Sequence, residues 1–345
     1  MSYITTDNLN AINAELTNYC NAACPMCARY FIDGTLNKDK VNSVHTTLEW
    51  FKEKISVDVV KRLTRFTSCG NFGDGAMNPD CLEIYKWLRQ LNPSMVLRLH
   101  TNGGARTQSF WSEMAKAGVQ VTFAIDGLED TNHLYRRKVK WQNLMQNVKA
   151  YIDSGGSATW AMLIFKHNEM QVDECRTLSQ ELGFSDFTIQ QSARWADYNA
   201  QGEWMDLDKI HVDNYYLEKS SLMKARELGS GGNSQKDLDT MNEFEQDSKK
   251  QFSTKKIHCM SCDHKNNNFE IYLAANGDVS PCCWLGDLQQ HESKNIIKDY
   301  KKVNLNHTSL EEILNGDFFK ELDGGIKGDD GFYRLHTCYG MCGVK

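Results

Sequence analysis

The chain has 345 residues, of which 41% are hydrophobic and 24% charged, and its formal net charge is −6 at pH 7. No apolar run approaches the roughly 20 residues that a membrane-spanning helix needs, so the composition predicts a folded domain that does not enter a membrane. With a negative net charge and no strongly basic block, the sequence carries no strong signal for nucleic-acid binding.

The cysteine content is the first unusual feature, because the chain contains 12 cysteines. The first residues lack the pattern of a secretory signal, so we expect a cytoplasmic protein, in which thiols stay reduced and more often hold metal than form disulfides. Eight cysteines form two groups that we predict to bind metal, namely Cys20, Cys24 and Cys27, and Cys259, Cys262, Cys282, Cys338 and Cys342.

The region up to about residue 190 alternates strand-like apolar runs with amphipathic, helix-like segments. Strands are predicted at residues 11–16, 64–68, 95–100, 120–125, 158–165 and 186–190. Helices are predicted over residues 80–91, 108–117, 141–153 and 169–182. A glycine follows each of the last three helices, and Asp80 is placed to cap the first with its side chain. Repeated βα units predict an α/β fold built on a partial (β/α)6 TIM-like barrel.

The remainder of the chain has a different character. Residues 196–258 are polar and lose the alternation, which indicates a connector. Residues 268–284 then read as a β-hairpin that turns at Asn276-Gly277, with cysteines in place of a large apolar core. We therefore expect a barrel over residues 1–195, a connector over 196–258 and a small cysteine-rich β-hairpin domain over 259–345.

The first cysteine group has the pattern C-x-x-x-C-x-x-C and follows the first predicted strand directly. In such barrels the chemistry lies at the ends of the strands where this loop begins. Three thiolates on one loop can bind three irons of a [4Fe–4S] cluster and leave the fourth iron open to another ligand. A zinc loop is the alternative, but zinc sites usually add a second short cysteine pair or a histidine, and neither occurs nearby.

This spacing and position resemble the radical S-adenosylmethionine (SAM) superfamily. The resemblance implies that SAM binds the open iron through its amino and carboxylate groups. Electron transfer into the sulfonium would then give methionine and a 5′-deoxyadenosyl radical, which abstracts hydrogen from a substrate. Met26 stands where relatives often have an aromatic residue before the third cysteine, which leaves the ligands intact.

Further turns resemble the SAM-binding turns of that family. One follows the second strand, one the third strand in the order Thr-Asn-Gly, and one the fourth strand in the order Asp-Gly. The resemblance implies that Gly73, Asp74, Asn102, Asp126 and Arg136 contribute to cofactor binding.

Several of these positions depart from the family pattern. Gly75 replaces a proline, and Ala124 replaces a serine whose hydroxyl often contacts the ribose. Arg137 fits the spacing as well as Arg136 does, and either arginine could instead be a solvated helix charge. Lys166, His167 and Asn168 close the fifth predicted strand, where relatives commonly have an asparagine and the strand end contributes to the adenosine or substrate pocket.

The second cysteine group resembles the twitch and SPASM auxiliary-cluster domains. Cys262, Gly277 and Cys282 match the opening pattern C-x(9–15)-G-x4-C, and Cys259 competes with Cys262 for the first place. The resemblance implies one auxiliary [4Fe–4S] cluster closed by the last two cysteines, because the seven cysteines of a full SPASM pattern are not present. A four-cysteine zinc site is the alternative.

The resemblance thus implies a radical SAM enzyme that abstracts hydrogen from a peptide or a small-molecule substrate, for oxidation or another modification. An electron donor such as flavodoxin or ferredoxin would be its partner. The alternative is a noncatalytic metal-binding interaction protein that keeps the same barrel. The sequence assigns no catalytic acid or base.

Overall fold

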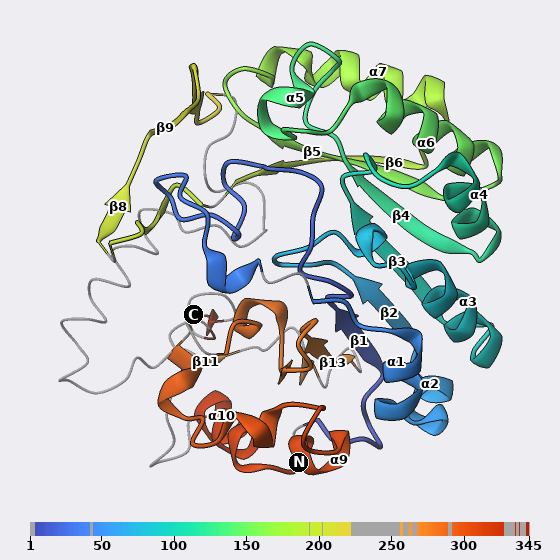
Figure 1. The fold of residues 1–345 in the computed structure, drawn as a ribbon, viewed down its shortest axis with the longest axis vertical. Helices are drawn as coiled ribbons and strands as arrows, with labels where there is room; N and C mark the ends of the chain where they lie inside the picture. The colour runs from blue at the N-terminus through green and yellow to red at the C-terminus, as the bar shows by residue number, and fades with distance from the viewer. Residues whose placement is uncertain are drawn as a thin grey trace.

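The computed structural model describes part of the chain, to which the following account refers. The described residues are 4–41, 44–192, 194–201, 203–221, 256–257, 262–263, 268–288, 292–327, 335, 338 and 343–344. In this part of the chain, helices cover one face of a curved, largely parallel sheet (Figure 1). Within the same ranges, no helix combines the length and apolarity needed to cross a membrane.

The six predicted barrel strands are confirmed, each within two residues of its predicted ends. They are β1 (Ala11–Ala14), β2 (Arg65–Ser68), β3 (Val96–Thr101), β4 (Val119–Ala124), β5 (Ala158–Ile164) and β6 (Asp186–Gln191). Each pairs in parallel with the next along the chain. Their carboxyl ends therefore meet at one edge of the sheet.

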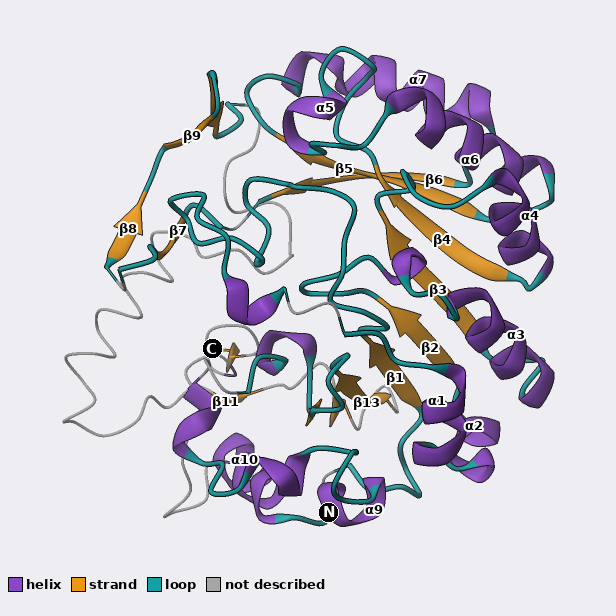
Figure 2. Ribbon diagram, in the orientation of Figure 1, coloured by secondary structure: helices purple, strands orange, loops and turns teal. Residues whose placement is uncertain are grey.

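The helices connecting these strands lie on the outer face of the sheet (Figure 2). The predicted helices appear as α3, α4, α6 and α7, the last preceded by a 3-10 turn, η3 (Glu169–Gln171). Helices α1, α2 and α5 were not predicted separately. Their bounds are α1 (Leu48–Lys54), α2 (Val57–Arg62), α3 (Cys81–Leu91), α4 (Gln108–Lys116), α5 (Asn132–Tyr135), α6 (Trp141–Asp153) and α7 (Val172–Leu182).

Asp80 is the N-cap residue of α3, as predicted, but its side chain does not cap the helix. Its backbone, at φ −93° and ψ 6°, is not extended as an N-cap residue normally is, and its side chain makes no capping hydrogen bond to α3. The carboxylate instead accepts a hydrogen bond of 3.0 Å from the backbone N–H of Leu48, the first residue of α1. Asp80 therefore joins two neighbouring helices.

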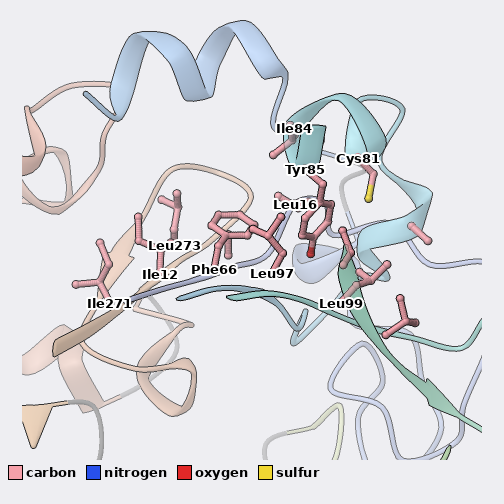
Figure 3. Packing of buried hydrophobic residues seen from close by; sticks show 14 of the residues in the cluster. Ile12, Leu16, Phe66, Cys81, Ile84, Tyr85, Leu97, Leu99, Ile271 and Leu273 are labelled. Atoms are coloured by element: carbon pink, nitrogen blue, oxygen red, sulfur yellow. The ribbon is translucent and has the colours of Figure 1, made fainter. Parts of the chain in front are cut away.

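The core lies between the sheet and its helices (Figure 3). Residues of β3 alternate strictly, with Leu97 and Leu99 buried and Arg98 and His100 exposed on the opposite face. This period of two places apolar side chains under the helices and leaves polar side chains on the inner face of the barrel sheet. The inner face of β3 is thus open to solvent and not packed as a core.

The predicted connector contains regular structure in its described part. Two short antiparallel pairs occur there, β7 with β8 and β9 with β10. Their bounds are β7 (Ala196–Tyr198), β8 (Trp204–Asp206), β9 (Lys209–Val212) and β10 (Tyr215–Glu218).

The predicted C-terminal hairpin is confirmed. It consists of β13 (Asn268–Leu273) and β14 (Val279–Ser280), and Gly277 in its turn has a φ of +91°, a conformation that favours glycine. β13 also pairs in parallel with β1, with Ala11 opposite Glu270 and Ala14 opposite Leu273. The hairpin thereby extends the barrel sheet, which runs in the order β12-β13-β1-β2-β3-β4-β5-β6.

Among the other C-terminal elements, α9 and α10 lie on one side of β13 (Figure 1). The strands are β11 (Lys256–Ile257), β12 (Cys262–Asp263) and β15 (Gly343–Val344), and the helices are η4 (Cys283–Leu285), η5 (Glu292–Asn295), η6 (Tyr300–Val303), α9 (Leu310–Leu314) and α10 (Asp317–Lys327). The structure leaves the predicted domain boundaries untested, and they remain predictions.

The alternation in β3 gives a direct test of the fold. Leu97→Ala removes a side chain that is 0% exposed and should lower the free energy of unfolding by about 2–5 kcal/mol. Val96→Ala is the matched control, because the Val96 side chain is 36% exposed on the other face of the strand. This substitution should lower the free energy of unfolding by under about 1 kcal/mol. Urea denaturation measures both, and equal losses would contradict the assignment of the two faces.

Candidate active site at the cysteine loop

The loop that follows β1 carries the first cysteine group. Cys24 is 7% exposed, Cys20 and Cys27 are partly buried, and none of the three is in a disulfide. Burial, followed by the charge of Asp74, raises the pKa of Cys20 to about 12. Burial also raises the pKa of Cys24 to about 11, although Arg136 lowers it. The thiols of Cys20 and Cys24 therefore hold their protons at neutral pH until a metal ion displaces them.

Nitrogen donors of the protein surround the sulfur atoms. The backbone N–H of Ala22 lies 3.4 Å from Cys20 Sγ, and Asn102 Nδ2 lies 3.6 Å from the same atom. Arg136 Nη1 lies 3.7 Å from Cys24 Sγ. Such donors stabilise a thiolate, and hydrogen bonds of this kind are one means of tuning iron–sulfur clusters.

The donor set fits a cluster. In the described ranges, no three side chains of Cys, His, Asp or Glu are placed to hold one metal ion together. A [4Fe–4S] cluster requires no such convergence on a single ion, because each thiolate binds a different iron atom. Three closely spaced thiols with nitrogen donors at their sulfurs provide ligands of the kind that such a cluster uses.

Asn102, just after β3, connects the cysteine loop to the turn that follows β2. Its Nδ2 donates to Asn21 Oδ1 at 2.9 Å and to Asp74 Oδ2 at 2.7 Å. Its backbone N–H donates to the same Asp74 oxygen at 2.8 Å, and its Oδ1 accepts from the N–H of Gly104 at 2.8 Å. One buried amide thus fixes the relative positions of three loops.

Asp74 is held inside the protein by these contacts. Its carboxylate also accepts from Thr101 Oγ1 at 2.9 Å and from the N–H of Ala76 at 3.0 Å, and burial raises its pKa. Because protein donors surround the carboxylate, the turn can offer backbone atoms to a ligand more readily than this side chain. The backbone N–H of Asp74 donates to Tyr19 O at 3.0 Å, which holds the turn against the cysteine loop.

Gly73 is required by a close backbone approach. A Cβ atom at this position would lie 1.8 Å from the carbonyl oxygen of Thr17, so no other residue fits without displacing the loop. This constraint supports a positional role for the glycine that the sequence motif singled out.

Asp126 and Arg136 form a buried ion pair on the other side of the loop. Arg136 Nε donates to Asp126 Oδ2 at 2.6 Å, and the N–H of Leu163 donates to Asp126 Oδ1 at 2.7 Å. Although burial lowers the pKa of Arg136, Asp126 and Cys24 raise it overall. Arg137 instead pairs with Asp213 at 2.6 Å and is partly exposed. Of the two arginines that fit the sequence spacing, Arg136 is the one beside the cysteines.

The residues after β5 have different roles. Asn168 is buried and joins β4 to β5, because its Nδ2 donates to the carbonyl oxygens of Asp126 and Leu163 at 2.9 Å each. His167 stacks on Phe165, with ring centroids 5.6 Å apart. Burial, with a smaller contribution from His133, lowers the pKa of His167 to about 4, so its imidazole is neutral at pH 7.

The second cysteine group is described in part. Cys282, just after β14, and Cys338 are both partly buried and pack against the core. The structure describes the backbone of Cys262 in β12 and not its side chain. Cys259 and Cys342 lie outside the described residues.

Sequence reasoning missed Glu15, which is 2% exposed and contacts the turn containing Gly73. The available signal was a carboxylate near the end of a predicted strand whose other residues, apart from Asn13, are apolar, since buried acids are rare unless they have partners.

The buried ion pair allows a matched comparison of two adjacent arginines. Arg136→Met leaves Asp126 buried without its partner and should cost about 3–5 kcal/mol of stability, with loss of iron from reconstituted protein. Arg137→Met removes a pair with 34% and 66% exposed side chains and should cost under about 1 kcal/mol. Urea denaturation and iron analysis measure the effects, and similar losses in both variants would contradict this account.

Comparison with known proteins gives two family matches. Residues 14–178 match the model of the radical SAM superfamily, and residues 259–343 match the model of the SPASM iron–sulfur cluster-binding domain. No curated protein sequence matches the chain significantly.

Solved structures of similar fold cover nearly the whole chain. Streptococcus suis SuiB bound to S-adenosylmethionine is 15% identical with a TM-score of 0.57, covering 93% of this chain and 68% of SuiB. SuiB bound to the precursor peptide SuiA is 12% identical with a TM-score of 0.56, at 92% and 66% coverage. Native anSMEcpe with bound AdoMet and Cp18Cys peptide is 10% identical with a TM-score of 0.53, at 96% and 94% coverage.

At these identities the solved structures establish the fold, while the two sequence models identify the family. They match both the segment that contains the three-cysteine loop and the segment that contains the C-terminal cysteines. The chain is therefore a radical SAM enzyme, a member of the radical SAM superfamily with a C-terminal SPASM iron–sulfur cluster-binding domain.

Proposed function

We propose that the chain reductively cleaves SAM at a cluster held by Cys20, Cys24 and Cys27, and uses the resulting 5′-deoxyadenosyl radical to abstract hydrogen from a peptide or small-molecule substrate. The observation that carries this proposal is the single loop of three thiols with nitrogen donors at their sulfurs. When bound, the cluster supplies the electron and an iron open to SAM.

The residues around the loop prepare this site. Asn102 and Arg136 each place one N–H donor beside a cysteine sulfur, which favours the thiolate form that binds iron. Both residues are themselves fixed by buried carboxylates, Asp74 for Asn102 and Asp126 for Arg136. The loop therefore keeps its geometry with little reorganisation when iron enters.

SAM would lie against the turns at the ends of β2, β3 and β4. With the Asp74 carboxylate surrounded by protein donors, backbone carbonyl groups of the turn around Gly73 are the natural acceptors for the methionine ammonium. Both oxygens of Asp126 already have partners, namely Arg136 and the N–H of Leu163. We therefore assign Asp126 to positioning the site and not to direct contact with the ligand. Ala124 has no hydroxyl for the ribose.

The inner face of the sheet supports a polar substrate. Arg98, His100 and Gln120 are exposed there, and Arg98 Nε donates to Gln120 Oε1 at 3.3 Å. Although the His100 side chain is exposed as a whole, partial desolvation of its ring and then the charge of Arg98 lower its pKa, which favours the neutral imidazole at pH 7. SuiB and anSMEcpe have both been solved with bound peptides, and a peptide is accordingly the first substrate class to test.

For the C-terminal region we propose one auxiliary [4Fe–4S] cluster. Its ligands would be Cys282, Cys338, Cys342 and one of Cys259 and Cys262. The SPASM match supports iron–sulfur binding by this region, and the partly buried positions of Cys282 and Cys338 suit cluster ligands. An external reductant of the flavodoxin or ferredoxin type completes the proposal.

SAM cleavage tests the N-terminal site. Anaerobically reconstituted protein, incubated with SAM and dithionite, should release 5′-deoxyadenosine, and Cys24→Ala should abolish the product because it removes one of three iron ligands. Cys81→Ala is the control, since this buried thiol lies in α3 outside the loop. Product is measured by chromatography with mass detection. No product from the wild-type protein would favour a noncatalytic metal-binding role.

Metal analysis tests the auxiliary site. The wild-type chain should hold about eight iron atoms and eight sulfides, as two [4Fe–4S] clusters require. Cys282→Ala should hold about four and still form 5′-deoxyadenosine, because its remaining cluster is the one that binds SAM. About four irons with one zinc in the wild-type protein would instead make the C-terminal site a structural zinc site.

A further inference from the structure

A buried carboxylate joins the N-terminal strand of the barrel to the C-terminal hairpin. Glu15 follows β1 directly and is 2% exposed. Its Oε1 accepts from the N–H of Phe72 at 2.5 Å and from the N–H of Gly73 at 2.9 Å. Its Oε2 accepts from the hydroxyl of Tyr272 at 2.9 Å, and Tyr272, on β13, is 0% exposed.

These contacts fix the orientation of two consecutive peptide groups. Both N–H groups point to one oxygen of Glu15, and the described part of the chain contains no cis peptide. In a planar trans peptide the carbonyl points opposite to the N–H, so the carbonyl oxygens of Asn71 and Phe72 point away from Glu15. Glu15 therefore determines which way the backbone acceptors of this turn face.

The same turn is clamped on its other sides. Gly73 packs against the carbonyl of Thr17 with no room for a Cβ atom, and the N–H of Asp74 donates to Tyr19 O at 3.0 Å. The turn therefore lies between Glu15 and the backbone that leads into the cysteine loop. A change in the Glu15 contacts cannot be absorbed by a shift toward Thr17, and would alter the turn itself.

The C-terminal region contacts this turn at two points. One is the Tyr272 hydroxyl on Glu15, and the other is Asn71, whose Nδ2 donates to the carbonyl of Cys283 at 2.8 Å. Gly286 packs so closely that a Cβ atom there would lie 2.5 Å from the Tyr272 ring and 2.9 Å from Asn71 Nδ2. Cys283 directly follows Cys282, a proposed ligand of the auxiliary cluster.

We propose that Glu15 is a positioning residue for the SAM-binding turn, and that the Tyr272 hydroxyl, acting through Glu15, makes SAM affinity depend on the seating of the C-terminal hairpin. This inference rests on the proposed function, in which SAM binds beside this turn. It assigns to a strand of the C-terminal region an effect on the first site that is separate from electron transfer.

The chemistry of the site specifies a carboxylate. Three donors converge on the two oxygens of Glu15, and a glutamine of the same shape would direct its NH₂ group at one or two of them. Burial raises the pKa of Glu15 to about 7, and the hydrogen bonds from Phe72, Tyr272 and Gly73 oppose that rise. Because the Glu15 side chain is buried, water cannot replace these donors if one of them is lost.

The test compares SAM binding in full-length proteins with reconstituted clusters. Glu15→Gln should raise the Kd for SAM at least about tenfold, a change of about 1.4 kcal/mol, as measured by the SAM-dependent change in the EPR spectrum of the reduced protein. Tyr272→Phe should raise it about threefold or more. The double variant should bind about as weakly as Glu15→Gln alone, because the hydroxyl acts through the carboxylate.

Two further measurements separate positioning from general damage. At saturating SAM, the rate of 5′-deoxyadenosine formation by Glu15→Gln should return to near the wild-type rate, so the effect appears in KM for SAM and not in kcat. Glu270→Gln is the control, because it breaks the 2.9 Å Arg65–Glu270 bridge between β2 and β13, two positions before Tyr272. Its SAM affinity should stay within about twofold of the wild-type value.

Unchanged SAM affinity in Glu15→Gln at full iron content would overturn the inference, as would an equal loss in Glu270→Gln or additive effects of the two single variants. If Glu15→Gln does not retain its clusters, Tyr272→Phe decides, and unchanged affinity in that variant overturns the inference. If SAM does not change the EPR spectrum of the wild-type protein, the proposed function itself fails and the inference falls with it.

Discussion

The amide of Asn102 is the contact on which the site depends, because it joins the cysteine loop, the turn after β2 and the end of β3. Its partners are Asn21, Asp74 and the sulfur of Cys20. The cysteine loop packs Ala22, Cys24 and Met26 into the core, and polar contacts hold it to the edge of the sheet. Buried hydrogen bonds of this kind are strong only when every member has a partner, and Asp74 meets that condition through Thr101 and Ala76.

Near Cys24, a buried charged residue, Arg136, has the role that the Asn102 amide has near Cys20. Arg136 lies between Cys24 and Asp126 and compensates both the buried carboxylate and a thiolate at Cys24. A buried cation beside the cysteines reduces the cost of bringing several negative sulfurs together. Under the proposed function, the polar groups of the barrel mouth would support the cluster ligands, and the exposed inner face of β3 would be available to the substrate.

Much of this arrangement could be predicted from the sequence. The six strands were predictable because apolar side chains at a period of two, followed by glycine-terminated helices, leave few alternatives. The cysteine loop was predictable because its ligand spacing is local. The sequence could not predict that Arg136, and not Arg137, points toward the cysteine loop. Two adjacent residues at the end of a short helix differ only in the direction of their side chains.

What the sequence could not predict depends on contacts between distant residues. Glu15 reads as a charge at a strand end until Tyr272, far along the chain, is placed beside it. Asp80 is recognisable as the N-cap of α3, but its side-chain hydrogen bond to the first residue of α1 is not. The parallel pairing of β13 with β1 was equally hidden, because a hairpin turn at Asn276-Gly277 specifies only the antiparallel pairing of its own two strands.

The pairing of β13 with β1 also determines the order in which this protein can be completed during synthesis. β1 leaves the ribosome well before one of its two neighbours, which is made only when residues 268–273 emerge. Until then β1 is an unpaired sheet edge, which is a site for aggregation, and Glu15 lacks its tyrosine partner. A fragment ending at the predicted connector would keep that edge permanently. The C-terminal hairpin therefore completes the fold of the N-terminal barrel as well as forming part of the region that contains the second cysteine group.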